Sequence, residues 1–323
     1  MMVAATFTAM AAPRMHRPVV ARAPLPILTI QPEARLLVVA PHPDDETIGA
    51  GGLIQSVREA GGAVRVVYLT DGEAYPDGVR ASEHRSKPTQ FTYRDYGKRR
   101  QGEARHALRT LGVDDASALT FLGFPNNGLN RMMTRYWSER RRAFRSPYTR
   151  LDRPPKSEII EPDTEFRGED LTQELAQIIG DFKPTLVAVT RRADQHVDHC
   201  AAWYFVGDAL GDVQRVNPDY HVDLLSYIVH FNGWPFDDEE ARLSPPPLYG
   251  GTFGWVTLPL TDAQTRAKRQ ALHRYTTQMK VMGWFLDGFA RTNEVFGRPA
   301  VPHIVLPVRR SPCDDFIDPT LSP

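Results

Sequence analysis

Short apolar segments alternate with amphipathic segments from residue 35 to about residue 230, and this alternation restricts the possible folds more than any other feature. Most of the apolar segments are β-branched or aliphatic throughout, as in parallel strands that are buried on both faces. Strands that alternate with helices predict a Rossmann-like three-layer α/β/α fold with a mostly parallel sheet. The expected strands are 36–40, 64–70, 118–124, 185–190 and 224–230, and the expected helices are about 46–60, 95–111, 169–181 and 196–211.

The stretches outside this alternation divide the chain into a tail, a domain and a second tail. Residues 1–32 contain no acidic residue and are predicted to be disordered or to act as a targeting peptide. Residues 33–306 are predicted to form a single domain, whose C-terminal portion, 231–306, completes the substrate pocket. That portion is expected to hold a helix that starts near Asp262. Residues 307–323 are rich in proline and are expected to form no regular structure.

Residues 127–168 interrupt the alternation with a long, basic insertion. Insertions of this length in an α/β unit often form lids or substrate loops. A charged loop in contact with solvent is the simpler explanation of its arginines, and a cluster that binds an anionic part of a substrate is the alternative. The arginines are Arg131, Arg135, Arg140, Arg141, Arg142, Arg145, Arg150 and Arg153.

The composition argues against several classes of protein. Lysine and arginine together number 39, as do aspartate and glutamate, so the formal charge is zero and does not favour a nucleic-acid partner. No apolar run approaches the roughly 20 residues of a membrane-spanning helix. Two cysteines, Cys200 and Cys313, are too few for a disulfide scaffold or a multi-cysteine zinc site, and they suit a reducing compartment. A small-molecule substrate and a cytoplasmic location are therefore expected.

The segment PHPDDETIGAGG at 41–52 follows the first expected strand and opens a helix. Ligands of open α/β sheets bind beyond the carboxyl ends of the strands, so this segment lies where a site is expected. The helix dipole favours carboxylates in a first turn, which explains Asp44, Asp45 and Glu46 without any function. That explanation leaves out His42, which stands between two prolines that stiffen the turn. The segment therefore predicts half of a metal site.

A second cluster, RRADQHVDHC at 191–200, follows another expected strand and also opens a helix. His196 and His199 are three residues apart, so they share one face of that helix. A single pair of this kind is often incidental. Catalytic zinc sites, however, usually take three protein ligands and leave one position open. Two clusters at equivalent strand ends therefore predict one shared metal centre.

The motifs HPDDE at 42–46 and HVDH at 196–199, in this order and on this pattern of strands and helices, resemble those of the PIG-L/LmbE-like family of zinc-dependent de-N-acetylases. The resemblance spans about residues 35–230. It implies an LmbE-like fold and one Zn²⁺ per chain. It also implies hydrolysis of the acetamide, or of another acyl amide, of an N-acetylglucosamine-type amino sugar or its conjugate.

The same resemblance implies roles for single residues. Asp44 corresponds to the general base. His196 corresponds to the residue that stabilises the oxyanion or protonates the leaving amine, and Asp198 would tune the charge of His196. The family's metal ligands correspond to His42, Asp45 and His199.

Three further residues are expected to contact substrate. Arg100, in RQGE at 100–103, resembles a substrate-contacting arginine of the family, although an ordinary helical pair with Glu103 explains it equally well. In FPNNGL at 124–129, the family commonly has an aspartate where this chain has Asn126. Asn126 and Asn127 are expected to contact the substrate, so the replacement bears on sugar specificity rather than on metal chemistry.

The expected ligand set has a clear chemical consequence. Two imidazoles and one carboxylate leave a zinc site with a net charge of about +1, enough to lower the pKa of a bound water towards 7. Two other functions fit the same residues: a non-haem iron enzyme with a His/His/Asp triad, or a sugar-binding homologue that has lost catalysis. Another divalent transition metal and a homo-oligomer are also compatible with the sequence.

Overall fold

The structure is a computed structural model that describes residues 24–83, 86–138, 140, 142–235, 241–246 and 254–314. Its strands are β1 (Arg35–Ala40), β2 (Ala63–Thr70), β3 (Leu119–Phe124), β4 (Leu186–Thr190), β5 (Asp223–Tyr227), β6 (Trp255–Pro259) and β7 (Asn293–Gly297). Its helices are α1 (Asp45–Glu59), α2 (Pro76–Glu83), α3 (Gln90–Thr110), α4 (Leu129–Met132), α5 (Gly168–Phe182), α6 (Val197–Val216), α7 (Asp262–Leu272) and α8 (Thr276–Asp287).

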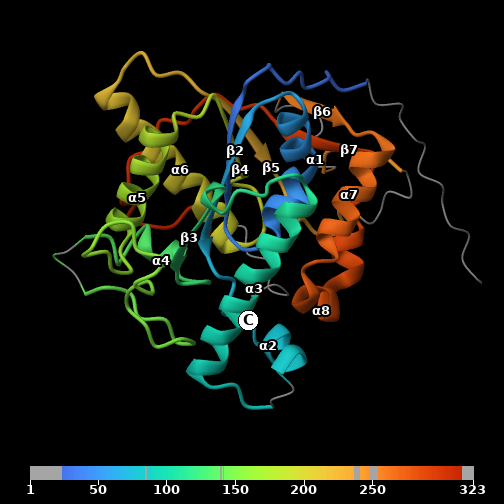
Figure 1. Cartoon of the computed structure of the whole chain (residues 1–323). Helices are drawn as coiled ribbons and strands as arrows, with labels where there is room; N and C mark the ends of the chain where they lie inside the picture. Colours follow the sequence, from blue (N-terminus) through green and yellow to red (C-terminus); the bar gives the residue numbers. More distant parts are fainter. Residues whose placement is uncertain are drawn as a thin grey trace, which may run out of the picture.

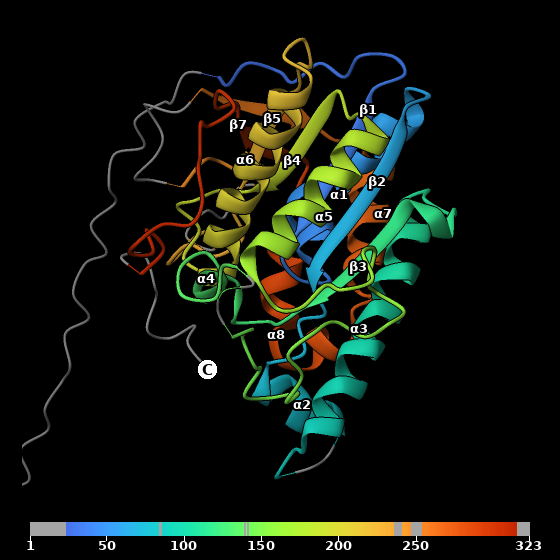
Figure 2. The same cartoon turned by 90° about the vertical axis from the view of Figure 1, so that its left-hand side faces the viewer.

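The strands form one mixed sheet in the order β3-β2-β1-β4-β5-β7-β6 (Figure 1). Strands β1 to β5 pair in parallel, and β7 runs antiparallel to both of its neighbours. Helices α1, α3 and α7 cover one face of the sheet, and α5 and α6 cover the other (Figures 1 and 2). The expected three-layer α/β/α fold is therefore confirmed.

Strand β1 shows why the sheet is buried on both faces. Its residues are apolar at successive positions, and side chains alternate between the faces of a strand. Leu36 and Val38 pack into the core beneath α1, whereas Leu37 and Val39 pack into the core beneath α5 and α6. This strand lies beside β4 at the centre of the sheet, and the chain runs outward from the two in opposite directions. The carboxyl ends of β1 and β4 therefore border the crevice where α/β sheets bind ligands.

Helix α1 approaches the sheet closely because two of its positions are glycine. A Cβ atom at Gly49 would lie 2.1 Å from a ring carbon of Tyr227, and one at Gly52 would lie 2.4 Å from the Leu260 side chain. Any larger residue would push the helix outward. The glycines that follow the acidic cluster thus fix the position of the helix whose first turn carries that cluster.

Both chain ends contain more ordered structure than the sequence suggested. Within the expected N-terminal tail, residues 24–32 run beside β6, where the Leu28 N–H donates to the Thr257 carbonyl at 2.8 Å. Residues 1–23 lie outside the described residues. In the proline-rich C-terminal tail, the Val308 N–H donates to the Met133 carbonyl at 3.1 Å. Residues 307–314 contain no helix or strand, but this contact packs them against the domain.

The two cysteines are joined, which the sequence did not lead us to expect. Cys200, in α6, forms a disulfide with Cys313, 113 residues away, and both are buried. The bond ties the C-terminal segment to the helix that carries His199. Disulfides of this kind are typical of oxidising compartments, so this one argues against the expected reducing environment.

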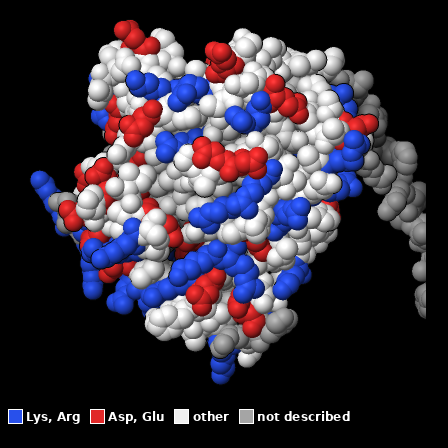
Figure 3. Space-filling model, in the orientation of Figure 1, with Lys and Arg blue, Asp and Glu red and all other residues white. Residues whose placement is uncertain are grey.

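The arginine-rich insertion is packed onto the domain at its apolar positions. Leu129, Met132, Phe144 and Phe166 are buried in the core that also contains α5 and α6. Of the eight arginines named above, the seven that the structure describes are all exposed. Figure 3 shows basic side chains spread among acidic ones over the face of the molecule that it draws. This pattern fits the solvated charged face rather than an arginine cluster directed at the site. Arg141 lies outside the described residues.

None of the described helices is long and apolar enough to cross a bilayer.

Candidate metal centre

Three side chains from two distant parts of the chain meet at the carboxyl ends of β1 and β4. His42 lies in the loop after β1, Asp45 is the first residue of α1, and His199 lies in the first turn of α6. His42 Nδ1 is 3.1 Å from His199 Nε2 and 3.2 Å from Asp45 Oδ2, which is itself 3.1 Å from His199 Nε2. Neighbouring ligands of a tetrahedral ion with bonds of about 2.1 Å are about 3.4 Å apart. The three atoms are therefore spaced to hold a single ion.

Each of the two histidine ligands faces a hydrogen-bond acceptor with one ring nitrogen, and this acceptor determines which nitrogen of the ring keeps a free electron pair. His42 Nε2 lies 3.1 Å from the Asn126 amide oxygen, and His199 Nδ1 lies 3.2 Å from the Asp194 carboxylate. Both partners are acceptors, so each of these nitrogens carries the hydrogen of a neutral imidazole. His42 Nδ1, His199 Nε2 and Asp45 Oδ2 then point electron pairs at one another. Such an arrangement needs a positive charge at its centre, and a divalent cation fits it.

A proton competes with the cation for this position. Burial opposes protonation of His199, but the carboxylates of Asp194 and Asp45 outweigh it and raise the pKa of His199 well above its usual value. Burial likewise opposes ionisation of Asp45, yet His199 and His42 hold its pKa well below its usual value. Metal binding must displace the histidine proton, so affinity for the cation is expected to fall as the pH is lowered.

Asp44 lies beside the three donors without being one of them. Its backbone has φ of 130°, a region that side chains rarely occupy and that is found at functional sites. The residue is 5% exposed, and its carboxylate lies 3.1 Å from Arg100 Nη2. Burial raises the pKa of Asp44 to about 7, and the Arg100 guanidinium limits this rise. A carboxyl group with such a pKa can take up and release a proton near neutral pH.

Arg100 is buried and faces the acidic loop rather than the helix surface. It is 3% exposed, and it donates to the carbonyls of Gly72 at 2.8 Å and Pro43 at 2.6 Å as well as to Asp44. The helical pair with Glu103 is not its main contact, because Glu103 accepts hydrogen bonds from α8 instead. The structure thus places Arg100 behind Asp44, where its charge acts on that carboxylate.

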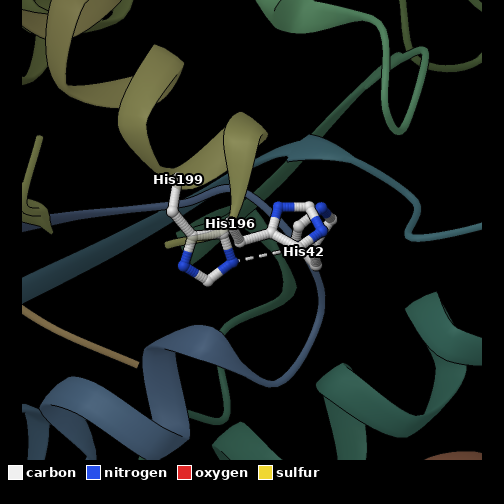
Figure 4. A group of neighbouring side chains, drawn as sticks. All are labelled: His42, His196 and His199. Carbon is white, nitrogen blue, oxygen red and sulfur yellow. Dashed lines mark hydrogen bonds between the residues drawn. The ribbon is translucent and has the colours of Figure 1, made fainter. Parts of the chain in front are cut away.

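His196 caps the start of α6 and lies beside His42 and His199 (Figure 4). Its Nδ1 accepts the Asp198 backbone N–H at 3.2 Å, so the ring hydrogen is on Nε2. Burial and three neighbouring histidines lower the pKa of His196 well below its usual value. At neutral pH the ring is therefore an uncharged hydrogen-bond donor.

The carboxylate of Asp198 contacts the turn before α4 and His42. It accepts the backbone N–H groups of Asn127 at 2.5 Å and Leu129 at 3.3 Å, and it lies 3.4 Å from His42 Nε2. Among the hydrogen bonds of the described residues, Asp198 contacts the His196 side chain through its backbone N–H and not through its carboxylate. This carboxylate is directed at His42 and at the turn before α4, so the tuning of His196 by Asp198 stays a prediction.

The two asparagines support this centre through different contacts. The side-chain oxygen of Asn126 faces His42, and the Asn126 backbone N–H donates to Glu73 at 3.2 Å. The Asn127 side chain donates to the Ala74 carbonyl at 3.1 Å and is partly exposed. Contact of either residue with substrate stays a prediction.

Glu46, the third acid of the first motif, holds the loop in place. It is fully buried, and its carboxylate accepts the Tyr275 hydroxyl, the Thr47 hydroxyl and the Asp44 backbone N–H. Tyr275 immediately precedes α8, so this network connects the strained Asp44 backbone to the C-terminal part of the domain. Glu46 therefore has a structural role.

The sequence did not identify two residues of the site. Asp194 accepts the backbone N–H groups of His196, Val229 and His230 and faces His199. His230 follows β5, and its ring lies 4.8 Å from that of His199, centre to centre. The signals available were weak: one acid in a polar loop, and one histidine at the end of an apolar strand.

The arrangement can be compared with known proteins. A 1D-myo-inositol 2-acetamido-2-deoxy-alpha-D-glucopyranoside deacetylase of Saccharopolyspora erythraea is 27% identical over 274 residues, which are 79% of this chain and 80% of the relative. A conserved protein of Thermus thermophilus shares the fold with a TM-score of 0.50 at 21% identity, over 84% of this chain and 97% of its own. The N,N'-diacetylchitobiose deacetylase of Pyrococcus horikoshii also shares the fold, with a TM-score of 0.50 at 16% identity, over 81% of this chain and 82% of its own.

A family model provides the assignment. The PIG-L model, described as GlcNAc-PI de-N-acetylase, matches residues 37–210, more than half of the 323 residues. The matched stretch contains both histidine motifs and the strands that present them. The chain therefore belongs to the PIG-L family of GlcNAc-PI de-N-acetylases.

Proposed function

We propose that this protein hydrolyses the acyl amide, an acetamide first of all, of an N-acetylglucosamine-type amino sugar or its conjugate. The observation that carries the proposal is the convergence of three electron pairs, from His42, Asp45 and His199, beside a buried carboxyl group that can exchange a proton near pH 7. Membership of the PIG-L family supports the same reaction. The names of its relatives support an amino-sugar substrate.

His42, Asp45 and His199 would hold one Zn²⁺ per chain, because nitrogen and carboxylate donors at this spacing suit that ion. When bound, the cation would polarise the amide carbonyl and lower the pKa of water. The same His/His/Asp set occurs in non-haem iron enzymes, which use it on other folds and have no need of a neighbouring carboxyl base. Asp44 favours hydrolysis over that alternative.

Asp44 would act as the general base. Its carboxylate takes a proton from the attacking water, and Arg100 holds the carboxylate in position. His196 would donate its Nε2 hydrogen to the oxygen on which negative charge develops. Because the pKa of His196 lies well below its usual value, the ring holds no extra proton at neutral pH. We therefore assign transfer of a proton to the leaving nitrogen to Asp44 rather than to His196.

The reaction is tested by measuring acetate release from three substrates: N-acetylglucosaminyl-inositol, N,N'-diacetylchitobiose and free N-acetylglucosamine. We expect release by the purified protein, loss of release after dialysis against a chelator, and recovery when Zn²⁺ is added back. Acetate release that is unaffected by complete removal of metal would contradict the proposal, and so would the absence of release from every acetamido sugar in the metal-loaded protein.

The position of Arg100 predicts a shift in the pH dependence. The base must be ionised, so kcat/KM should rise with pH as Asp44 loses its proton, at or below about pH 7 once a cation is bound. Arg100 lowers the pKa of Asp44, so Arg100→Met should move this rise to higher pH by about one to three units. The measurement is kcat/KM against pH, which reports groups of the free enzyme.

Arg100→Lys is the matched control, because it keeps the positive charge and should shift the profile much less. Thermal unfolding of both variants shows whether loss of the carbonyl contacts of Arg100 has weakened the fold. An unchanged pH profile in a folded Arg100→Met protein would show that Arg100 does not affect the pKa of the base.

We propose direct substrate contact for Asn127, whose side chain is partly exposed, and a positioning role for Asn126 on His42.

A further inference from the structure

We propose that His230 is a further catalytic residue, which donates a hydrogen bond to the amide carbonyl oxygen of the substrate alongside His196. This inference rests on the proposed function. His230 follows β5, the neighbour of β4 in the sheet, so its loop lies next to the loop that carries His196 and His199. Three parallel strands, β1, β4 and β5, thus each present a histidine at their carboxyl ends.

The ring of His230 stands at the metal centre. One donor atom each of His230, His199 and Asp45 lie within 4.8 Å of one another. The same holds for His196 with His42 and His199. The rings of His196 and His230 are 5.3 Å apart, centre to centre, and both residues are only partly buried. The two histidines therefore flank the ligand group on its accessible side.

His230 is held in place by contacts that leave its ring nitrogens available. Its backbone N–H donates to Asp194 at 3.1 Å, and its carbonyl accepts the Gln195 N–H at 2.9 Å. Its ring stacks on Phe285, with centres 5.4 Å apart and an angle of 13° between planes. Within the described part of the chain, the hydrogen bonds of His230 all run through its backbone. A neutral imidazole always carries one N–H, so the fixed ring offers a donor.

Asp194 links this ring to the rest of the centre. One carboxylate oxygen accepts the backbone N–H groups of Val229 and His230 and faces His199, and the other accepts the His196 N–H. A ligand and both flanking histidines are thus positioned by a single buried side chain. Donors fixed in advance in this way are effective because they need no rearrangement as charge develops on the carbonyl oxygen.

The test compares His230→Phe, which keeps a flat ring against Phe285 but removes both nitrogens, with His230→Asn, which restores an N–H donor. We expect His230→Phe to lower kcat/KM for acetate release by about 10²- to 10³-fold, as the loss of one oxyanion donor does, and His230→Asn to recover at least about tenfold. The matched control is His221→Phe, an exposed histidine before the opposite end of β5, which should behave like the wild type.

Two readouts separate a donor from a metal ligand or a packing residue. Zn²⁺ affinity, measured by competition with a chelator, should change by less than about threefold in His230→Phe, because ligand loss has a far larger effect. Calorimetric binding of acetate to the zinc-loaded protein should weaken by about 3- to 10-fold, the effect of one lost hydrogen bond. Thermal unfolding shows whether each variant is folded. If His230→Phe is not folded, acetate binding by His230→Asn is measured in its place.

The outcomes distinguish this inference from the proposed function. A fall of 100-fold or more in Zn²⁺ affinity would make His230 a ligand and overturn the inference, as would wild-type kcat/KM and acetate binding in His230→Phe. Both of these results require a wild-type protein that releases acetate. If the zinc-loaded wild type releases none from any acetamido sugar, the proposed function itself fails, and the inference fails with it.

Discussion

Asp44→Asn is expected to lower kcat/KM for acetate release by about 10²- to 10⁴-fold while the protein still binds its metal. The amide keeps the shape of the carboxylate but cannot accept the proton of the attacking water. Asp44 is not one of the three converging donors, so its replacement leaves the ligand set intact. The measurements are steady-state kinetics and the metal content of the purified variant.

The neighbouring residue supplies the control for this substitution. Asp45→Asn weakens one of the three donors, and it is expected to reduce Zn²⁺ affinity by at least about 100-fold, more than the loss of an outer-shell partner. The two variants should therefore have different defects: Asp44→Asn in catalysis and Asp45→Asn in metal binding. Retention of more than about a tenth of wild-type activity by a metal-loaded Asp44→Asn protein would show that Asp44 is not the base.

Lys268→Met is expected to lower the free energy of unfolding by about 3–5 kcal/mol, because it leaves the buried Glu294 carboxylate without its ion pair. Both residues are 1% exposed, and Lys268 Nζ lies 2.5 Å from Glu294 Oε1. The lysine also donates to the Ile48 carbonyl, and the glutamate accepts the N–H groups of Gly52 and Leu53. The pair therefore braces the middle of α1, whose first turn carries Asp45.

The double variant Lys268→Met/Glu294→Gln tests the reason for this loss. It removes the unpaired charge and keeps one oxygen for the backbone of α1, so we expect it to be more stable than Lys268→Met alone. Urea denaturation gives the free energy of unfolding for both. A cost below about 1 kcal/mol for Lys268→Met, or a double variant that is less stable than the single one, would show that burial of an unpaired charge is not the cause.

The sequence predicted the parts of the site that depend on local spacing. The HPDDE motif places His42 and Asp45 three residues apart in one turn, and HVDH places His199 at the start of a helix. Parallel strands end at the same edge of a sheet, so the two motifs could be expected to meet once the strands were recognised. The same reasoning predicted the five parallel strands, because most of them are apolar on both faces.

The parts that were missed depend on contacts between distant segments. Glu294 and Gly52 are 242 residues apart, and neither position differs in sequence from an ordinary surface charge or a helix glycine. Cys200 and Cys313 pair only because the C-terminal segment folds back on α6, which its prolines did not suggest. His230 carries no motif of its own. Its place beside His199 follows from the neighbouring positions of β4 and β5.

The central claim is that His42, Asp45 and His199 bind one divalent cation, and anomalous X-ray diffraction at the zinc edge from crystals of the zinc-loaded protein tests it most directly. The expected result is one strong peak per chain, about 2.0–2.2 Å from His42 Nδ1, Asp45 Oδ2 and His199 Nε2. A zinc-loaded crystal with no peak between these three atoms, or with its zinc held by other side chains, would contradict the claim.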